Sequence, residues 1–185
     1  ILAADDADVI DGGNDADTAQ FAAAVSSTEL TDSDLVNVER VQITATANNG
    51  IYDFRAQTEG LTFVAGSGTD TILAGSGNDV FRMETVAQIA GDSLSGGTGT
   101  DTLRGMITDV DLSSTTLSSI EILEAGTTSS TRFLVNQADL LSGGSVSGAA
   151  GTDTLALVSS EATLDLSSTT LSSVEVILGN GNDNV

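Results

Sequence analysis

Aspartate is the residue type in this sequence that could do chemistry, because it recurs at a fixed spacing behind glycine. Asp70 closes the run GSGTD, and Asp79 closes the run GSGND nine residues later. Both runs fit the pattern G-x-G-x-D-x-U, where U is a large apolar residue. Glycine permits a tight turn with inward carbonyls, and calcium prefers hard carboxylate and carbonyl oxygens. The residues of the two runs are therefore candidate metal ligands, namely Gly66, Gly68, Asp70, Gly75, Gly77, Asn78 and Asp79.

Further copies of the turn are spread along the chain. Asp101, Asp153 and Asp183 each close a similar run, and the run at Asp153 is the weakest of the three. A degenerate pair at the start places Asp8 and Asp17 nine residues apart. In that pair Asp6 and Asp15 stand where the second glycine is expected, and aspartate tolerates a left-handed backbone better than most residues. These aspartates, Asp6, Asp8, Asp15, Asp17, Asp101, Asp153 and Asp183, complete the candidate metal ligands.

The repeated turn resembles the RTX, or haemolysin-type, nonapeptide repeat. The resemblance implies an all-β fold, a right-handed parallel β-solenoid (β-roll or β-helix) with calcium-binding turns on one edge and Ca²⁺ as the cofactor. In that family each ion lies between successive turns, which here implies a site between Asp70 and Asp79 and another between Asp8 and Asp17. Asp101 and Asp153 have no intact neighbour nine residues away. They could pair across a longer coil or bind nothing, since G-x-G-x-D is also an ordinary turn sequence.

A longer repeat lies on top of the nonapeptides. The segment DLSSTTLSSIE at 111–121 returns almost unchanged as DLSSTTLSSVE at 165–175, and Leu35–Glu39 is a looser copy. The spacing from Asp17 to Glu39 equals the spacing from Asp153 to Glu175. We therefore expect one continuous solenoid over 1–185, built from three degenerate repeats at about 1–65, 66–148 and 149–185, the last continuing into a neighbouring copy. We expect the glutamates of the three L-x-x-(I/V)-E segments at equivalent positions, paired with arginine, hydrated or bound to a cation.

Local patterns favour strands between the turns. Residues 38–44 alternate between apolar and polar types, as half-buried strands do. Three segments, 19–30, 83–90 and 133–141, are ambiguous and could form short helices instead. The large apolar residue two positions after each turn aspartate is expected to point into the core and begin the next strand.

Composition narrows the function classes. The chain has 27 acidic residues against five arginines and no lysine, for a net charge of −22. Such a chain repels nucleic acid and anionic membrane surfaces, and it has no apolar run long enough for membrane insertion. It has neither cysteine nor histidine, so the usual nucleophiles and general bases are missing. The repeat accounts for the carboxylates, and we therefore expect no enzyme activity.

The sequence thus predicts a non-catalytic extracellular structural protein, a calcium-stabilised repeat unit of a surface layer, filament or adhesin stalk. Its expected partner is a second copy of itself, joined end to end so that Asp183 and Asp8 share an ion. The expected location is outside the cell or on a bacterial surface, after secretion without a cleaved N-terminal signal. Two alternatives stay open: an adhesin module that binds a cell-surface glycan, and the non-catalytic secretion or folding module of a secreted enzyme.

Overall fold

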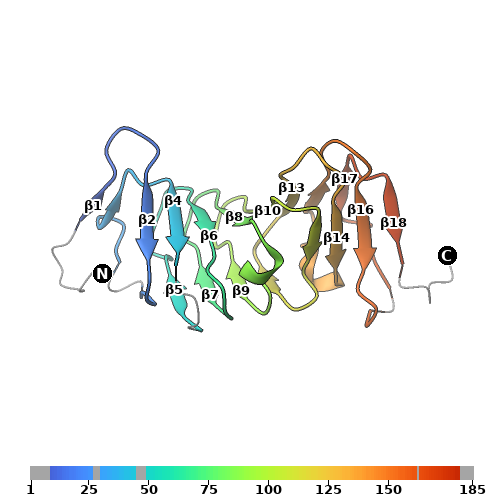
Figure 1. Ribbon diagram of the computed structural model, residues 1–185, viewed down its shortest axis with the longest axis horizontal. Coiled ribbons are helices and arrows are strands. Elements are labelled where there is room, and N and C mark those ends of the chain that lie inside the picture. Colours follow the sequence, from blue (N-terminus) through green and yellow to red (C-terminus); the bar gives the residue numbers. More distant parts are fainter. Residues whose placement is uncertain (1–8, 27–29, 45–48, 162, 180–185) are drawn as a thin grey trace.

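Short parallel strands dominate the fold. The computed structural model describes residues 9–26, 30–44, 49–161 and 163–179, and nearly all of its regular structure is β. The strands follow one another in sequence order along one long axis, from β1 at one end to β18 at the other (Figure 1). Every pair of hydrogen-bonded strands in the described residues is parallel. The predicted all-β parallel solenoid is confirmed.

The largest sheet, here called the main sheet, has eight strands and runs through most of the described length. Its strands are β2 (Thr18–Phe21), β4 (Arg40–Ile43), β6 (Thr62–Val64), β8 (Val80–Met83), β10 (Thr102–Gly105), β13 (Ile122–Ala125), β15 (Ser145–Ser147) and β17 (Thr170–Ser172). Each strand pairs with the next one on this list, so one coil separates neighbours in the sheet. The main sheet is therefore the continuous face of the solenoid.

Two four-stranded sheets form the other faces. The second sheet contains β5 (Ile51–Asp53), β7 (Thr71–Leu73), β9 (Ser93–Ser95) and β12 (Thr116–Ser118). The third sheet contains β11 (Asp109–Asp111), β14 (Arg132–Val135), β16 (Thr154–Leu157) and β18 (Val176–Leu178). A small pair at the start joins β1 (Ile10–Asp11) to β3 (Leu35–Val36). The second sheet covers residues 51–118 and the third sheet residues 109–178, so the two overlap only in the coil that contains β11 and β12.

Coil length varies because the connections between faces differ. The register pairs Thr62 with Val80, so this coil has the length of two nonapeptides. Other main-sheet partners are further apart in sequence: Arg40 pairs with Thr62, and Ser145 pairs with Thr170. Among these main-sheet coils, only the one that contains the tandem repeat is two nonapeptides long, and the others contain longer loops.

The core is a set of stacked apolar columns. The inward position of the main sheet carries Val41, Phe63, Phe81, Leu103, Leu123 and Val146 on successive strands, all nearly or fully buried. In the first half, Phe21, Phe54, Phe63 and Phe81 form a chain of ring contacts with centroids 5.1–5.4 Å apart. The predicted inward residues after the turn aspartates, Ile72, Phe81, Leu103 and Leu155, are all buried. Burial of these large side chains supplies the main driving force for folding.

The segments with ambiguous patterns contain little helix. Residues 83–90 hold one 3₁₀ turn, η1 (Val86–Gln88), and residues 133–141 hold another, η2 (Gln137–Asp139), after strand β14. The segment 19–30 contains most of β2 and an isolated bridge from Val25 to Tyr52. Each 3₁₀ turn packs beside a strand of the third or second sheet, η1 against β11 and η2 against β12, and so fills a position on a face where a strand is absent.

The two copies of the long repeat lie on different faces. In the first copy, TLS at 116–118 forms β12 of the second sheet, and the following strand β13 joins the main sheet. In the second copy, TLS at 170–172 forms β17 of the main sheet, and β18 joins the third sheet. The same local sequence therefore makes the same local structure after a shift of one face around the coil.

Candidate functional site

Five of the predicted metal ligands in the described residues lie at corners of the coil, immediately before strands: Asp17, Asp70, Asp79, Asp101 and Asp153. On the main sheet, the Asp79 amide donates a 2.8 Å hydrogen bond to Oδ1 of Asp101, one coil further along. Oδ1 of Asp79 in turn accepts 2.7 Å from the amide of Leu61, and Oε2 of Glu121 accepts 2.7 Å from the amide of Asp101. Leu61, Asp79, Asp101 and Glu121 thus form a column in which each carboxylate binds the backbone of the preceding coil. We call this the main column.

A second column stands before the strands of the second sheet. Oδ1 of Asp70 accepts 3.0 Å from the amide of Gly50, and the Asp70 amide donates 2.7 Å to Oδ1 of Asp92. A third column stands before the third sheet, where Oδ1 of Asp153 accepts 2.6 Å from Thr131 and the Asp153 amide donates 2.7 Å to Oε2 of Glu175. In all three columns the carboxylate satisfies a corner amide that the strand ladder does not reach, and such amides are costly to leave unpaired when buried.

Four column aspartates keep one oxygen without a partner in the described structure. Oδ2 of Asp70, Asp79, Asp92 and Asp101 is buried and accepts no hydrogen bond of regular geometry, and each of these residues is at most 1% exposed. At Asp79, against the larger effect of burial, a weaker backbone interaction with Gly75 still lowers the pKa of the carboxyl. Burial raises the pKa of Asp79 and of Asp92 to about 6 and also raises the pKa of Asp101. A buried carboxylate oxygen with no donor is unfavourable unless a proton or a cation joins it. Asp153 differs, because its Oδ2 accepts 2.9 Å from the amide of Ala149.

The glycines of the tandem turn allow neighbouring coils to touch through their backbones. The amide of Thr98 donates 3.0 Å to the Gly75 carbonyl, and the Gly77 amide donates 3.0 Å to the Thr98 carbonyl. A Cβ on Gly77 would overlap the backbone of Glu59 in the preceding coil. Asn78 adds a side-chain link, with Oδ1 accepting 2.9 Å from the amide of Thr100. The turn glycines and Asn78 are therefore explained by coil stacking.

The first turn of the tandem repeat leads into a different sheet from the second turn. Gly68 adopts a left-handed φ of 133°, and Gly66 and Gly68 lead into Asp70 and β7 of the second sheet. Asp79 leads into β8 of the main sheet. The structure therefore brings Asp79 together with Asp101, and Asp70 together with Asp92, whereas Asp70 and Asp79 begin strands on two different faces.

The three L-x-x-(I/V)-E segments repeat one corner geometry. Their third residues, Asn37, Ser119 and Ser173, have left-handed φ values of 52°, 51° and 51°. Their glutamates, Glu39, Glu121 and Glu175, each accept through Oε2 the amide of the aspartate one coil earlier, at 2.7–2.8 Å. The glutamates therefore occupy equivalent positions, as predicted, and their partner is a backbone amide. We call this arrangement the glutamate corner.

A glycine completes each glutamate corner. The amides of Gly12, Gly96 and Gly148 donate 2.8–3.0 Å to Val36, Ser118 and Ser172 respectively. Each of these glycines lies five residues before the corner aspartate, and a Cβ on it would overlap the carbonyl of the left-handed residue. The signal G-x₄-D followed one coil later by L-x-x-(I/V)-E therefore marks this coil-to-coil contact in the sequence.

The degenerate turns at the chain start are only partly described. Asp17 belongs to the first glutamate corner, and its Oδ2 has no partner among the described residues. Asp15 lies exposed before it. Asp6 and Asp8, and Asp183 at the other end, lie outside the described residues, as does the predicted contact between the two ends.

Three buried acids were not among the predicted ligands: Asp92, Asp139 and Asp53, which pairs with Arg55. Asp92 stacks on Asp70 in the second column, and it could have been found because its spacing from Asp70 equals that from Asp17 to Glu39. Asp139 is 3% exposed, and its carboxylate accepts 2.8 Å from the Asn136 amide at the start of η2. Burial raises the pKa of Asp139 to about 6. No repeat marks Asp139, because its role is local to that turn.

The donor chemistry of the columns suits a hard cation, although the described residues contain no group of three or more acidic side chains placed to hold a metal. A cation would have to combine single carboxylate oxygens, such as Oδ2 of Asp79 or Asp101, with backbone carbonyls. Calcium accepts carbonyl and carboxylate ligands in flexible numbers. The columns therefore offer donors of the right type, one or two at a time.

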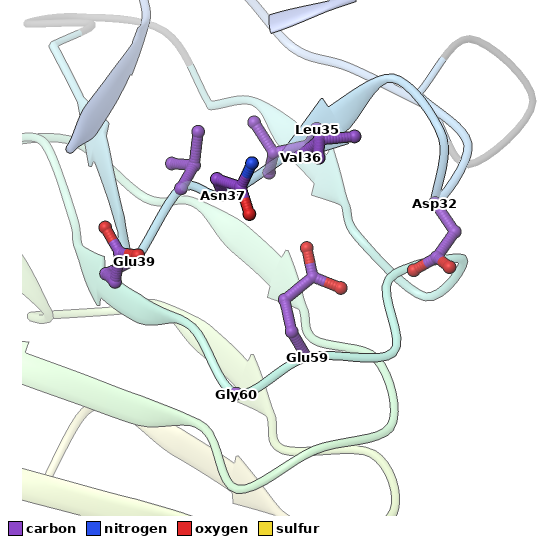
Figure 2. A pocket seen from close by; sticks show the side chains of 8 residues that line it. Asp32, Leu35, Val36, Asn37, Glu39, Glu59 and Gly60 are labelled. Atoms are coloured by element: carbon purple, nitrogen blue, oxygen red, sulfur yellow. The ribbon is translucent and has the colours of Figure 1, made fainter. Parts of the chain in front are cut away.

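An open acidic hollow of about 510 Å³ lies near the start of the solenoid. Figure 2 shows Glu59 rising into it between Asp32 on one side and Glu39 on the other, below the β3 residues Leu35 and Val36. Oδ1 of Asp32 accepts 2.8 Å from the amide of Thr58, which fixes that wall. The hollow forms because β3 pairs with β1, while residues 57–60 of the next coil form no strand beneath it.

No protein-family model, curated protein or solved structure matches this chain. The described residues include no helix long and apolar enough to cross a membrane. The assignment of function therefore rests on the geometry of the columns and on the motifs themselves.

Proposed function

We propose that this chain is a non-catalytic structural element, a calcium-stabilised stretch of solenoid that serves as a building block of an extracellular array or stalk. The resemblance of its turns to the RTX nonapeptide supports the cofactor and the extracellular, secreted setting. The parallel solenoid suits such a role because coils add length without changing the cross-section.

The observation that carries the proposal is the unpartnered Oδ2 of Asp70, Asp79, Asp92 and Asp101. These four carboxylates are nearly inaccessible in a chain of net charge −22. Oδ1 of each accepts a backbone amide, but the second oxygen does not, and the stacked pairs Asp79/Asp101 and Asp70/Asp92 repel each other. A divalent cation bound to these oxygens supplies the missing positive charge, and binding to the folded state alone stabilises that state by mass action.

The hydrogen bonds that the column carboxylates accept support a structural role over a catalytic one. In the three columns, the aspartates and glutamates bind backbone amides of neighbouring coils. A general acid or base has to face a substrate, whereas these groups face the coil stack. Their arrangement favours holding coils together.

A glycan-binding role receives less support. All six aromatic side chains are buried, namely Phe21, Tyr52, Phe54, Phe63, Phe81 and Phe133. Sugar recognition usually uses an exposed ring for stacking, and the aromatic segment around Tyr52 is instead part of the core.

The proposal is tested by following folding against calcium at pH 7. Circular dichroism of the purified chain in excess chelator should show weak β signal, which should grow cooperatively at about 0.1–1 mM calcium, the range of extracellular calcium modules. Magnesium at the same concentration serves as the control, because it demands stricter octahedral geometry. A chain that folds fully in chelator and gains no thermal stability from calcium would refute the proposal.

A further inference from the structure

The few positive charges of this acidic chain are concentrated on one surface. Three of its five arginines lie on the outer face of the main sheet, Arg40 on β4, Arg82 on β8 and Arg104 on β10. Arg40 and Arg82 share Glu84, at 3.5 and 3.1 Å, and Arg104 binds Glu124 at 2.8 Å. We call these five side chains the arginine strip. It holds three positive and two negative charges within a chain of net charge −22.

Arg82 and Arg104 are direct cross-strand partners on adjacent parallel strands. Like charges directly opposite each other destabilise a sheet unless an anion lies between them. Both arginines line an open hollow of about 380 Å³, together with Met106, Glu124 and Gly126. Arg82 reaches Glu84 through Nε, so the outer edge of its guanidinium remains available. The pair is therefore arranged to bind a further carboxylate, which arginine binds through two parallel hydrogen bonds.

The side chains of the strip are held against the sheet. Val64 follows Thr62 and Phe63 on β6, and by strand alternation it faces outward, yet it is 0% exposed. The alkyl stems of arginine cover apolar surface in this way while keeping the guanidinium in water. The side chains of Arg82 and Arg104 are 36% and 42% exposed. A surface that is already ordered loses less entropy on binding.

The same chain carries a complementary surface. The acidic hollow contributes three carboxylates, from Asp32, Glu39 and Glu59, and no arginine of the described chain lines it. Glu59 stands in the middle of this hollow (Figure 2). The arginine pair lies on β8 and β10, whereas the hollow lies beside β3 and reaches the strip only where Glu39 precedes Arg40. Docking one of these different surfaces on the other makes a head-to-tail contact, which repeats without closing unless the rotation forms a ring.

We infer that the arginine strip of one copy docks on the acidic hollow of a second copy, with Arg82 and Arg104 binding the carboxylates of Glu59 and Asp32. The inference rests on the proposed building-block function and gives it a lateral contact. It is independent of any contact between the chain ends. Because the pairs are partly exposed, salt screens the contact, and association weakens as ionic strength rises.

Two variants separate the two surfaces. Arg82→Gln/Arg104→Gln removes the basic surface and keeps the acidic hollow, whereas Asp32→Asn/Glu59→Gln does the reverse and keeps the Asp32 oxygen that accepts the Thr58 amide. Arg132→Gln is the matched control, because Arg132 lies on the third sheet and pairs with Asp109. Circular dichroism at fixed calcium checks that all variants keep the wild-type fold.

The test is sedimentation velocity of the full chain at one calcium concentration, in about 50 mM and about 500 mM salt. Wild type and Arg132→Gln should associate at low salt and dissociate at high salt. Each double variant alone should show an apparent dissociation constant at least about tenfold higher. A mixture of the two double variants should form dimers that do not grow, since each brings one intact surface.

The inference is overturned by wild type that stays monomeric at low salt, by double variants that associate like wild type, or by a mixture that stays monomeric. If the arginine variant alone loses association, the acidic hollow is the wrong docking site and the inference also fails. Calcium-dependent folding is measured separately, so a folded, calcium-responsive monomer would reject the docking surface and leave the proposed function standing.

Discussion

The amide of Asp79 donates a 2.8 Å hydrogen bond to Oδ1 of Asp101, a residue 22 positions later in the chain and one coil further along the solenoid. The two turn aspartates are thus linked because the Asp101 carboxylate, and not a backbone carbonyl, accepts the Asp79 amide. The same link recurs from Asp70 to Asp92. Carboxylates that the sequence pattern assigns to a metal also hold successive coils in register.

The first prediction concerns that link. Asp101→Ala should lower the free energy of unfolding by about 1–3 kcal/mol, because the Asp79 amide is left buried without an acceptor. Asp101→Asn keeps an acceptor oxygen and should cost less. Urea denaturation at fixed calcium measures both, with exposed Asp15→Ala as the control. Equal losses for Asp101→Ala and Asp15→Ala would show that the column bond does not stabilise the fold.

The second prediction concerns the glycines of the turns. Gly99 and Gly143 both have left-handed φ, at 136° and 83°, but a Cβ on Gly99 would overlap the Gly77 carbonyl, whereas a Cβ on Gly143 meets nothing within 4 Å. Gly143→Ala should therefore cost only the backbone strain, about 1–2 kcal/mol, and Gly99→Ala should cost clearly more. Thermal unfolding compares the two. Similar costs would mean that the coils can separate locally at this turn.

The third prediction concerns the glutamate corner. Ser119 is a non-glycine residue with φ of 51°, so Ser119→Gly should relieve strain and raise the free energy of unfolding by about 0.5–1 kcal/mol. Ser118→Gly, at the neighbouring strand position, should lower it instead. A stabilisation measured for Ser118→Gly, or a loss for Ser119→Gly, would argue against the left-handed corner.

The fourth prediction follows from the pKa values of the buried acids. The pKa of Asp79 and of Asp92 is about 6 in the folded chain against 3.8 for a free aspartate, so the folded state binds more protons than the unfolded state between these values. Stability in chelator should therefore be greatest near pH 4 and fall as pH rises through about 6. Thermal unfolding in chelator, followed from pH 4 upward until the folded signal is lost, tests this, and Asp79→Asn should flatten the decline. A wild-type melting temperature that rises over this range would contradict the burial of these groups.

The sequence predicted the architecture better than the pairing of the turns. Alternation in residues 38–44 and the apolar residue after each turn aspartate predicted strands and their buried faces, because both depend on local periodicity. The resemblance of the tandem turns to the RTX repeat implied a calcium site shared between Asp70 and Asp79. The structure places them on two faces, since two nonapeptides complete one coil between Thr62 and Val80.

The lengths of the coils explain why local sequence could not predict which residues stack on one another. Identical TLS segments become β12 of the second sheet and β17 of the main sheet, because the loops before them differ in length and rotate the second copy by one face. Stacking partners are set by the total length of a coil. Asp92 was overlooked for that reason: its link to Asp70 depends on the length of the coil between them and on no glycine motif.

The central claim is that the buried column aspartates bind the stabilising calcium, and the most direct test compares Asp79→Asn with Glu121→Gln. Both changes remove one charge and keep an acceptor oxygen in the main column, but Asp79 has a buried unpartnered Oδ2 and Glu121 is more exposed. The measurement is the rise in melting temperature with calcium at pH 7. We expect Asp79→Asn to lose most of the rise seen in wild type, and Glu121→Gln to retain it. An equal calcium response in wild type and both variants would contradict the claim.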